Sequence, residues 1–232
     1  MSFEALGGIW KLEDLKAIGS YKENASIVQL AFDASFDEVK KEYVERGWWI
    51  DLNDGKIYQS LNLRPLKALK HIPGDDSSFD LLKVPELYIY PGEGNNRIRW
   101  EKHESVDLSE KDYTKVLALS YESIVAAVKR TKEIIKNTLA PKYYAVLVPI
   151  KRVGMVKDKF VLEDQSGDRI VLKDRVEDVY GHPYTEGLSM LKEELVEGNS
   201  IFGLMYYDEK DKAIYLHPYS IVEKDRIVRL KF

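Results

Sequence analysis

Hydrophobic positions recur with the two-residue period of β-strands through the last ninety residues of the chain, 143–232. The pattern runs through residues 144–148 and resumes at Val153 and Val156, which predicts one long first strand that bends at Gly154. Two further runs follow, joined by a Gln-Ser-Gly-Asp sequence that favours a tight hairpin turn. The segments predicted after the first strand are strands at 160–164 and 169–173, a helix at 188–195, and strands at 200–207 and 213–217.

Three strands, a helix and two strands, in this order, are typical of the OB fold, a small barrel that binds oligonucleotides or oligosaccharides. We therefore expect residues 141–232 to form a small OB-like β-barrel domain. A different small barrel and an open α+β sheet have the same periodicity and stay as alternatives. The pattern indicates a binding module and names no reaction.

The first 140 residues mix the two periodicities, and we expect them to form an α+β domain with antiparallel hairpins. Residues 34–47 contain Ser35 and Glu38 at capping-box spacing and end in glycine, which predicts a short helix. Asn53-Asp-Gly55 is a strong signal for a hairpin turn. The remaining predictions are hairpins of 48–52 with 56–61 and of 86–90 with 97–101, and a short helix over 64–71.

A longer helical pattern covers residues 109–139. It begins with Ser109 and Asp112 at capping-box spacing, and apolar residues then recur every three or four positions. Pro141 cannot continue a helix, so it marks the end of the element. The sequence thus predicts two domains, an α+β domain at 1–140 that ends in a long helix and a barrel domain at 141–232.

Composition and charge narrow the function classes. Of the 232 residues 44% are hydrophobic, and the formal net charge is -4. Residues 143–232 carry 14 basic and 16 acidic side chains, and residues 1–142 carry 21 and 23, so neither part is a basic domain of the kind that binds nucleic acid non-specifically. Cysteine is absent, which excludes disulfides, thiolate metal sites and a cysteine nucleophile. The chain shows no membrane-spanning run or signal-peptide start, and we expect a cytoplasmic location.

Aromatic and basic residues on the predicted strands are the candidate binding residues. The second hairpin places aromatic rings and guanidiniums together, residue types that stack on bases or pack against a peptide. The same alternation also describes an ordinary amphipathic strand, with Trp100 on one face and Arg99 on the other. The candidates are Tyr88, Tyr90, Arg97, Arg99 and Trp100 on the hairpin, and Tyr144, Phe160, Arg169, Lys173 and Tyr206 on the barrel strands.

One polar cluster raises the question of catalysis. Glu101, His103, Glu104 and Asp107 lie within seven residues of each other and include side chains that bind metals or transfer protons. The same residues also suit a solvated connection after a strand. Hydrolase and phosphate-loop motifs are absent from the sequence. We therefore predict no catalytic residue, metal or cofactor, and keep a metal-dependent hydrolase or nuclease as the second alternative.

A resemblance to a known family rests on five short segments of the sequence, at 61–69, 87–92, 97–99, 160–167 and 214–220. These segments resemble the region that accompanies the zinc finger in bacterial SWIM-type proteins. The finger itself needs cysteines, so the resemblance implies neither zinc nor finger-mediated binding here. It implies a companion module in proteins that bind nucleic acid or other proteins.

These observations favour a non-enzymatic binding or adaptor module that engages a protein partner. Near-neutral charge and many tyrosines favour a protein surface as the ligand. The alternative is a single-stranded nucleic-acid-binding protein that uses the OB-like barrel. The sequence does not fix the oligomeric state.

Overall fold

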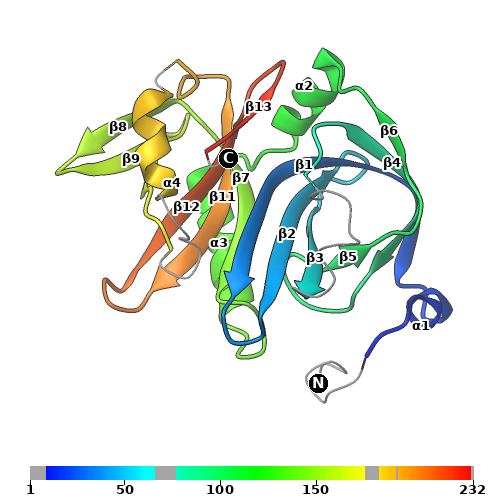
Figure 1. The fold of residues 1–232 in the computed structure, drawn as a ribbon. Coiled ribbons are helices and arrows are strands. Elements are labelled where there is room, and N and C mark those ends of the chain that lie inside the picture. Colours follow the sequence, from blue (N-terminus) through cyan, green and yellow to red (C-terminus); the bar gives the residue numbers. More distant parts are fainter. Residues whose placement is uncertain (1–8, 66–76, 176–182, 192, 231–232) are drawn as a thin grey trace. The chain divides into compact units, whose positions relative to one another are not determined.

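The computed structural model describes residues 9–65, 77–175, 183–191 and 193–230 (Figure 1). The chain folds as two compact units, Met1–Leu108 and Ser109–Phe232, which we call the N-terminal and C-terminal units. Helices and antiparallel strands are both present, as expected for an α+β chain. In the described residues no helix is long and apolar enough to span a bilayer.

The N-terminal unit is built on one six-stranded sheet. Its order is β3-β2-β1-β4-β5, and β6 pairs with the same strand, β4, as β5 does. All the strand pairs are antiparallel. The strands are β1 (Tyr21–Asp37), β2 (Glu42–Asp51), β3 (Ile57–Pro65), β4 (Leu81–Ile89), β5 (Ile98–Arg99) and β6 (Glu104–Val106).

This sheet closes on itself where its two outer strands meet. Gln59 and Arg97 form a parallel bridge, and the Gln59 amide donates to the Asn96 carbonyl at 3.0 Å. The Gln59 side chain donates to the Asn95 carbonyl at 3.2 Å, and the Asn95 side chain donates to the Ile57 carbonyl at 3.1 Å. The result is a nearly closed barrel-like sheet, which the sequence had not predicted for this part of the chain.

Buried apolar side chains from β1 to β5 fill this barrel and form its core. Helix α1 (Leu12–Ala17) adds a smaller cluster, in which Leu15 packs with Tyr88 and Tyr90. Burial of this apolar surface is the main stabilising contribution to the unit. The main cluster contains Ala25, Ile27, Trp49, Tyr58, Leu82, Val84, Leu87 and Ile98.

The helix predicted over 34–47 is wrong, because these residues form the tip of the β1–β2 hairpin. Ala34 pairs with Glu45, and the Asp37 carboxylate accepts the amides of Val39 and Lys40 at 2.9 Å each. Asp37, between the predicted cap residues Ser35 and Glu38, thus holds a turn, and Ser35 pairs with Val44 in the strand ladder. Strand pairing that continues from 27–33 overrides the local helical pattern.

Both predicted hairpins of the N-terminal unit are confirmed. β2 and β3 pair from Ile50 and Ile57 outward, around a turn in which Gly55 has a φ of 73°. β4 pairs with β5 through Tyr88 and Arg99. Of the helix predicted over 64–71, the first two residues belong to β3, and the others lie outside the described residues.

The C-terminal unit contains a three-stranded sheet, β10-β9-β8, and a four-stranded sheet, β13-β12-β11-β7. The predicted long first strand is two strands, β7 and β8, because the chain changes partner at Ile150. The Ile150 amide donates to the backbone carbonyl of Asn199 at 2.9 Å, whereas the Lys151 amide donates to the backbone carbonyl of Glu163 at 2.9 Å. The strands are β7 (Tyr143–Pro149), β8 (Arg152–Val156), β9 (Lys159–Glu163), β10 (Arg169–Val171), β11 (Ser200–Asp208), β12 (Ala213–Val222) and β13 (Ile227–Arg229).

An isolated parallel bridge between Leu172 and Leu216 joins the two sheets. If β7 and β8 are counted as one bent strand, neighbouring strands follow the order β8-β9-β10-β12-β11-β7, so the order closes on the strand where it began. This is the same cyclic order as in the N-terminal unit. Between β10 and β11 lie α4 (Tyr184–Gly187) and a 3₁₀ turn, η4 (Leu188–Met190), so the predicted helix over 188–195 begins earlier and ends earlier than expected.

The long helix predicted over 109–139 is two helices, α2 (Glu110–Ala118) and α3 (Ile124–Ile135). The predicted capping box at Ser109 is confirmed. Ser123 begins the second helix by accepting the Ala126 amide at 3.1 Å, and the buried Asp164 accepts the Ile124 amide at 2.6 Å. Because α3 packs on β7 and β11, the compact units divide after Leu108, whereas the sequence had placed the domain boundary at 140/141.

Gly203 is a position where even a small substitution should destabilise the fold. It lies at a bulge between β11 and β12, where an added Cβ would be 2.2 Å from the His217 carbonyl oxygen. We expect Gly203→Ala to lower the free energy of unfolding by about 2 kcal/mol or more. Gly154→Ala is the matched control, because a Cβ there meets no atom within 4 Å. Equal midpoints for the two variants in urea denaturation would contradict this packing.

Candidate functional site

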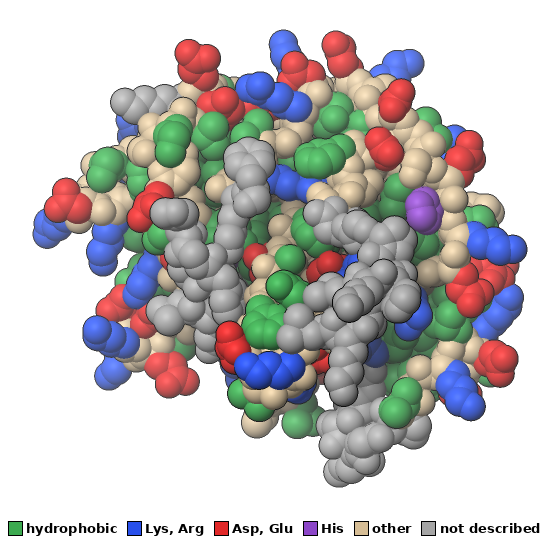
Figure 2. Space-filling model, in the orientation of Figure 1, with side chains coloured by type: hydrophobic (Ala, Val, Ile, Leu, Met, Phe, Trp, Pro, Cys, Tyr) green, Lys and Arg blue, Asp and Glu red, His purple; other side chains and the backbone are tan. Residues whose placement is uncertain are grey.

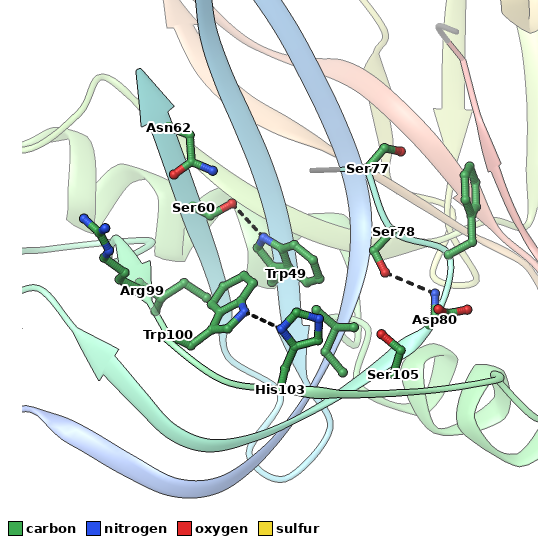
Figure 3. Close-up of a pocket in the computed structure, with 13 residues that line it drawn as sticks. Trp49, Ser60, Asn62, Ser77, Ser78, Asp80, Arg99, Trp100, His103 and Ser105 are labelled. Carbon is green, nitrogen blue, oxygen red and sulfur yellow. Dashed lines mark hydrogen bonds between the residues drawn. The ribbon is translucent and has the colours of Figure 1, made fainter. Parts of the chain in front are cut away.

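A cavity of about 620 Å³ opens in the N-terminal barrel between β3 and the strands β4, β5 and β6 (Figure 3). It lies beyond the bridge of Gln59 to Arg97, where β3 and the chain after β5 separate. Aromatic, polar and charged side chains line it together. Among them are Trp49, Ser60, Asn62, Asp80, Arg99, Trp100, His103 and Ser105.

Two tryptophans define the apolar part of the cavity. Trp49 is fully buried on β2 and Trp100 is half-buried, and their ring centroids lie 5.1 Å apart in an edge-to-face arrangement. The Trp49 indole donates to the Ser60 hydroxyl at 2.9 Å. A Cβ at Gly47 would lie 2.6 Å from that indole nitrogen, so the glycine makes room for the ring.

Trp100 and His103 lie on a short segment that leaves the sheet. β4 pairs with Arg99 at one end and with Glu104 at the other, and residues 100–103 run between these points without strand pairing. The Trp100 indole donates to Nδ1 of His103 at 3.3 Å (Figure 3). The excursion turns both rings toward the cavity instead of toward a neighbouring strand.

Basic side chains surround this segment. A second cavity, of about 420 Å³, shares His103 with the first and is lined by Lys83, Lys102 and Glu104 among others. Arg99, Lys83 and Lys102 are exposed, and no ion pair joins them to a carboxylate of the described residues. The two cavities therefore place an exposed aromatic edge beside cations that keep their capacity to bind an anion.

The structure separates the five hairpin candidates into two groups. Arg99 and Trp100 line the cavity. Tyr88 and Tyr90 are buried in the α1 cluster, and the Arg97 guanidinium stacks on the Tyr90 ring at 3.8 Å. These last three residues are placed as a packed structural group outside the cavity lining. The binding roles of all five remain predictions.

The basic barrel candidates of the C-terminal unit are engaged within the protein. Lys173 lies 2.7 Å from both Asp208 and Asp211. Arg169 lies 2.7 Å from Glu163, which Arg152 also contacts at 2.8 Å. Because these carboxylates lie so close, they reduce the positive charge that Lys173 and Arg169 present to an external anion.

The aromatic barrel candidates do not converge on one site. Tyr206 is buried, and its hydroxyl donates to the Asp174 carbonyl at 3.2 Å. Tyr144 accepts from the Tyr121 hydroxyl at 3.5 Å. Phe160 is half-buried and lines an apolar groove beside β8. The three rings pack in different parts of the C-terminal unit.

The acidic and histidine residues at 101–107 form no metal centre. The structure describes all four of Glu101, His103, Glu104 and Asp107, and among the described residues no group of three or more His, Asp or Glu side chains could hold a metal ion. His103 also uses Nδ1 to accept from Trp100. The metal-dependent hydrolase or nuclease stays a prediction from the sequence.

Strands β2 and β3 contribute to the site, although no residue on them was a candidate from the sequence. Trp49, Ser60 and Asn62 line the cavity from these two strands. The turn at 53–55 sets which residues of the two strands lie opposite each other, and this register pairs Trp49 with Tyr58 and Gly47 with Ser60. The alternation of side chains along the strands then determines which of them face the cavity. Which of the two adjacent tryptophans faces the barrel could not be read without the register.

Comparison with known proteins gives only distant structural matches. No family model and no curated protein matches the chain. A murine DNA-binding protein bound with double-stranded DNA has 10% identity and a TM-score of 0.33, over 90% of this chain and 96% of the other. The tetrameric p202 HIN2 has 11% identity and a TM-score of 0.27, over 90% and 93%. A structure described as structural mimicry for functional antagonism has 7% identity and a TM-score of 0.27, over 85% and 90%.

These similarities are too low to assign a fold or a ligand to this chain. The resemblance to the companion region of SWIM-type proteins stays a prediction.

The ion pairs of Glu163 predict a pH-dependent stability. Hydrogen bonds from Arg152 and Arg169 lower the pKa of Glu163 from 4.5 to about 2. A lowered pKa in the folded state means that the carboxylate contributes stability above about pH 4.5 and loses it as the pH falls toward 2. We expect Glu163→Gln to lower the melting temperature at pH 7 and to match the wild type near pH 2.

The matched control is Glu209→Gln, because Glu209 is exposed and has no ion pair among the described residues. Melting curves between pH 2 and pH 7 provide the measurement. A difference between Glu163→Gln and the wild type that does not change with pH would contradict the assignment.

Proposed function

We propose that this chain is a non-enzymatic binding protein made of two OB-type barrels, and that the N-terminal barrel binds single-stranded nucleic acid. An OB barrel has five strands in the cyclic order 1-2-3-5-4, with a parallel contact between strands 3 and 5. The N-terminal unit has this order, with β3 and β5 bridged in parallel. The C-terminal unit has it when β7 and β8 count as one strand, with β10 and β12 in the parallel contact.

The fold supports a binding role only by analogy, so the side chains carry the proposal. The observation that carries it is Trp100, a half-buried ring at a cavity, next to Arg99, a cation without a carboxylate partner in the described residues. Single-stranded nucleic acid presents flat bases and a phosphate backbone. Proteins bind it by combining aromatic rings with positive charge.

The loops around the barrel also carry aromatic and basic side chains, which have partners within the protein. Lys41 lies 2.7 Å from Glu38, and the Tyr90 ring is buried. The β1–β2 hairpin carries Phe36 and Tyr43 with ring centroids 5.0 Å apart, and the Lys41 ammonium lies 5.8 Å from the Phe36 ring. The β4–β5 loop carries the stacked Tyr90 and Arg97. These are the positions of the two loops that bind ligands in OB barrels.

An oligosaccharide is the other ligand class that OB barrels bind. Tryptophan, serine and asparagine side chains suit sugars as well as bases. Arg99 lines the first cavity and Lys83 and Lys102 line the second, and these cations outnumber the carboxylates of the two linings, Asp80 and Glu104. A neutral sugar gives no reason for this excess of positive charge. The charges therefore favour an anionic ligand with flat rings.

Single-stranded nucleic acid is favoured over duplex by the wider charge distribution. Basic and acidic side chains are interspersed on the face shown in Figure 2, and the formal net charge is -4. Duplex binding depends on a concentrated positive surface. Base stacking at a local site needs fewer charges, because the rings contribute part of the affinity.

Three cations of the C-terminal unit have carboxylate partners, and this favours the N-terminal cavity as the site that binds. Lys173 and Arg169 have carboxylate partners, and Arg226 lies 3.0 Å from Glu223 and 3.3 Å from Glu194. An incoming phosphate would have to displace these partners. At the N-terminal cavity it would not.

Fluorescence anisotropy with a labelled oligothymidylate 20-mer tests this function. The wild type should bind the single strand more tightly than a duplex of the same length. Trp100→Ala should weaken binding by about tenfold, because one stacked base contributes about 1–3 kcal/mol. Arg99→Ala should weaken binding less and reduce the salt slope by about 0.7, the value for one phosphate contact.

Arg226→Ala is the matched control and should bind as the wild type does. Trp100→Phe keeps an aromatic ring and should retain most of the affinity, which separates loss of stacking from loss of fold. Equal affinities for Trp100→Ala and Arg226→Ala, or a preference for duplex, would overturn the proposal.

A further inference from the structure

One strand edge of the C-terminal unit has no neighbour along most of its length. β8 pairs with β9 on one side (Figure 1). On its other side Arg152 forms an isolated bridge with Val196, and no backbone group of residues 153–156 has a further partner among the described residues. Such an edge offers amides and carbonyls for pairing with another chain.

An apolar groove follows this edge. It has a volume of about 560 Å³ and lies between β8 and the segment that follows α4, with Val153, Met155, Phe160, Leu188 and Leu195 in its lining. Met155 and the adjacent Val156 are 60% and 55% exposed. Natural edge strands are usually protected by charge, proline or a bulge, and residues 153–156 contain no charge and no proline.

We propose that β8 binds an extended, acidic peptide of a partner protein as an added strand. Main-chain hydrogen bonds to the free edge would hold such a peptide, and its alternate apolar side chains would enter the groove. Gly154 in the middle of β8 favours close approach of another backbone, because the space where its Cβ would be is empty.

The charges beside the groove determine which charge the bound peptide should carry. Lys157 and Lys159 are exposed at the turn between β8 and β9, and no ion pair engages them within the described residues. Lys151 and Arg152 lie at the other end of β8, where Glu163 offsets part of their charge at 3.9 and 2.8 Å. Only Asp158 opposes the two lysines of the turn in the local sequence. An acidic peptide therefore meets positive charge at both ends of the strand.

A second copy of this chain fits the edge poorly. Antiparallel pairing of two β8 strands about Gly154 would place Lys151 of one copy opposite Lys157 of the other. Like charges directly opposite each other destabilise a strand pair. Nucleic acid has no alternating amides and carbonyls to pair with the edge, so it would leave the main feature of the surface unused.

This surface shares no residue with the N-terminal cavity, so each proposal can fail alone. It also gives a place for the protein partner that the sequence had favoured.

The probe is a fluorescein-labelled peptide in which glutamate alternates with valine or leucine over eight residues, titrated with the full chain and read by anisotropy. Met155→Asp should abolish binding, because it puts a negative charge at the groove. The matched control is Met190→Asp, since Met190 is an 82% exposed methionine on η4 that does not line the groove. The double variant Lys157→Glu, Lys159→Glu should weaken binding by about tenfold, or about 1.4 kcal/mol.

Two further peptides test the mode of binding. Methylation of alternate backbone nitrogens should abolish binding, because it removes the amides that would pair with β8. Replacing glutamate by lysine should weaken binding strongly.

The proposal is wrong if the acidic peptide does not bind, if the lysine peptide binds equally well, or if Met155→Asp binds like Met190→Asp. It is also wrong if sedimentation shows a wild-type dimer that Met155→Asp dissociates, since the occupant would then be a second copy. Loss of oligothymidylate binding in the double lysine variant would assign the turn to nucleic acid instead.

Discussion

The contact that closes the N-terminal barrel also creates its candidate site. Gln59 and Arg97 join β3 to β5 in parallel, and the side chains of Gln59 and Asn95 add hydrogen bonds across the same junction. Beyond this point β3 continues while the other chain segment leaves the sheet at Trp100. The separation of the two segments leaves the cavity open and exposes one edge of the tryptophan pair. A barrel closed along its whole length would have buried these rings completely.

The two units share a strand order, and both pair cations with carboxylates on their strands, as Arg64 pairs with Glu45 in the N-terminal unit. In the C-terminal unit, carboxylates lie close to the cations of the barrel strands, as Glu163 does to Arg152 and Arg169. In the N-terminal unit, Arg99 lies beside an aromatic ring without such a carboxylate among the described residues. The two proposed binding surfaces therefore differ in kind, a cavity in the first unit and a strand edge in the second.

Local sequence signals predicted the parts of the structure that depend on neighbouring residues. The turn at 53–55, the hairpin that places Arg99 beside Trp100, and the helix start at Ser109 are all confirmed. The helix over 34–47 was wrong because the two halves of this segment pair with each other as the tip of a long hairpin, Ala34 with Glu45 and Asp37 with Glu42. The cavity could not be predicted, since Trp49 and Trp100 meet only when the barrel closes. The change of sheet between β7 and β8 also depends on distant partners, Asn199 and Glu163.

The most direct test of nucleic-acid binding at the N-terminal cavity is an NMR titration of the ¹⁵N-labelled chain with unlabelled oligothymidylate, observed at the indole N–H groups of Trp49 and Trp100. Both donate hydrogen bonds within the site, to Ser60 and His103 respectively. We expect the Trp100 signal to shift most, the Trp49 signal to follow, and the amides of β10 to β12 not to change. Shifts confined to β10–β12, with both indole signals unchanged, would contradict binding at this cavity.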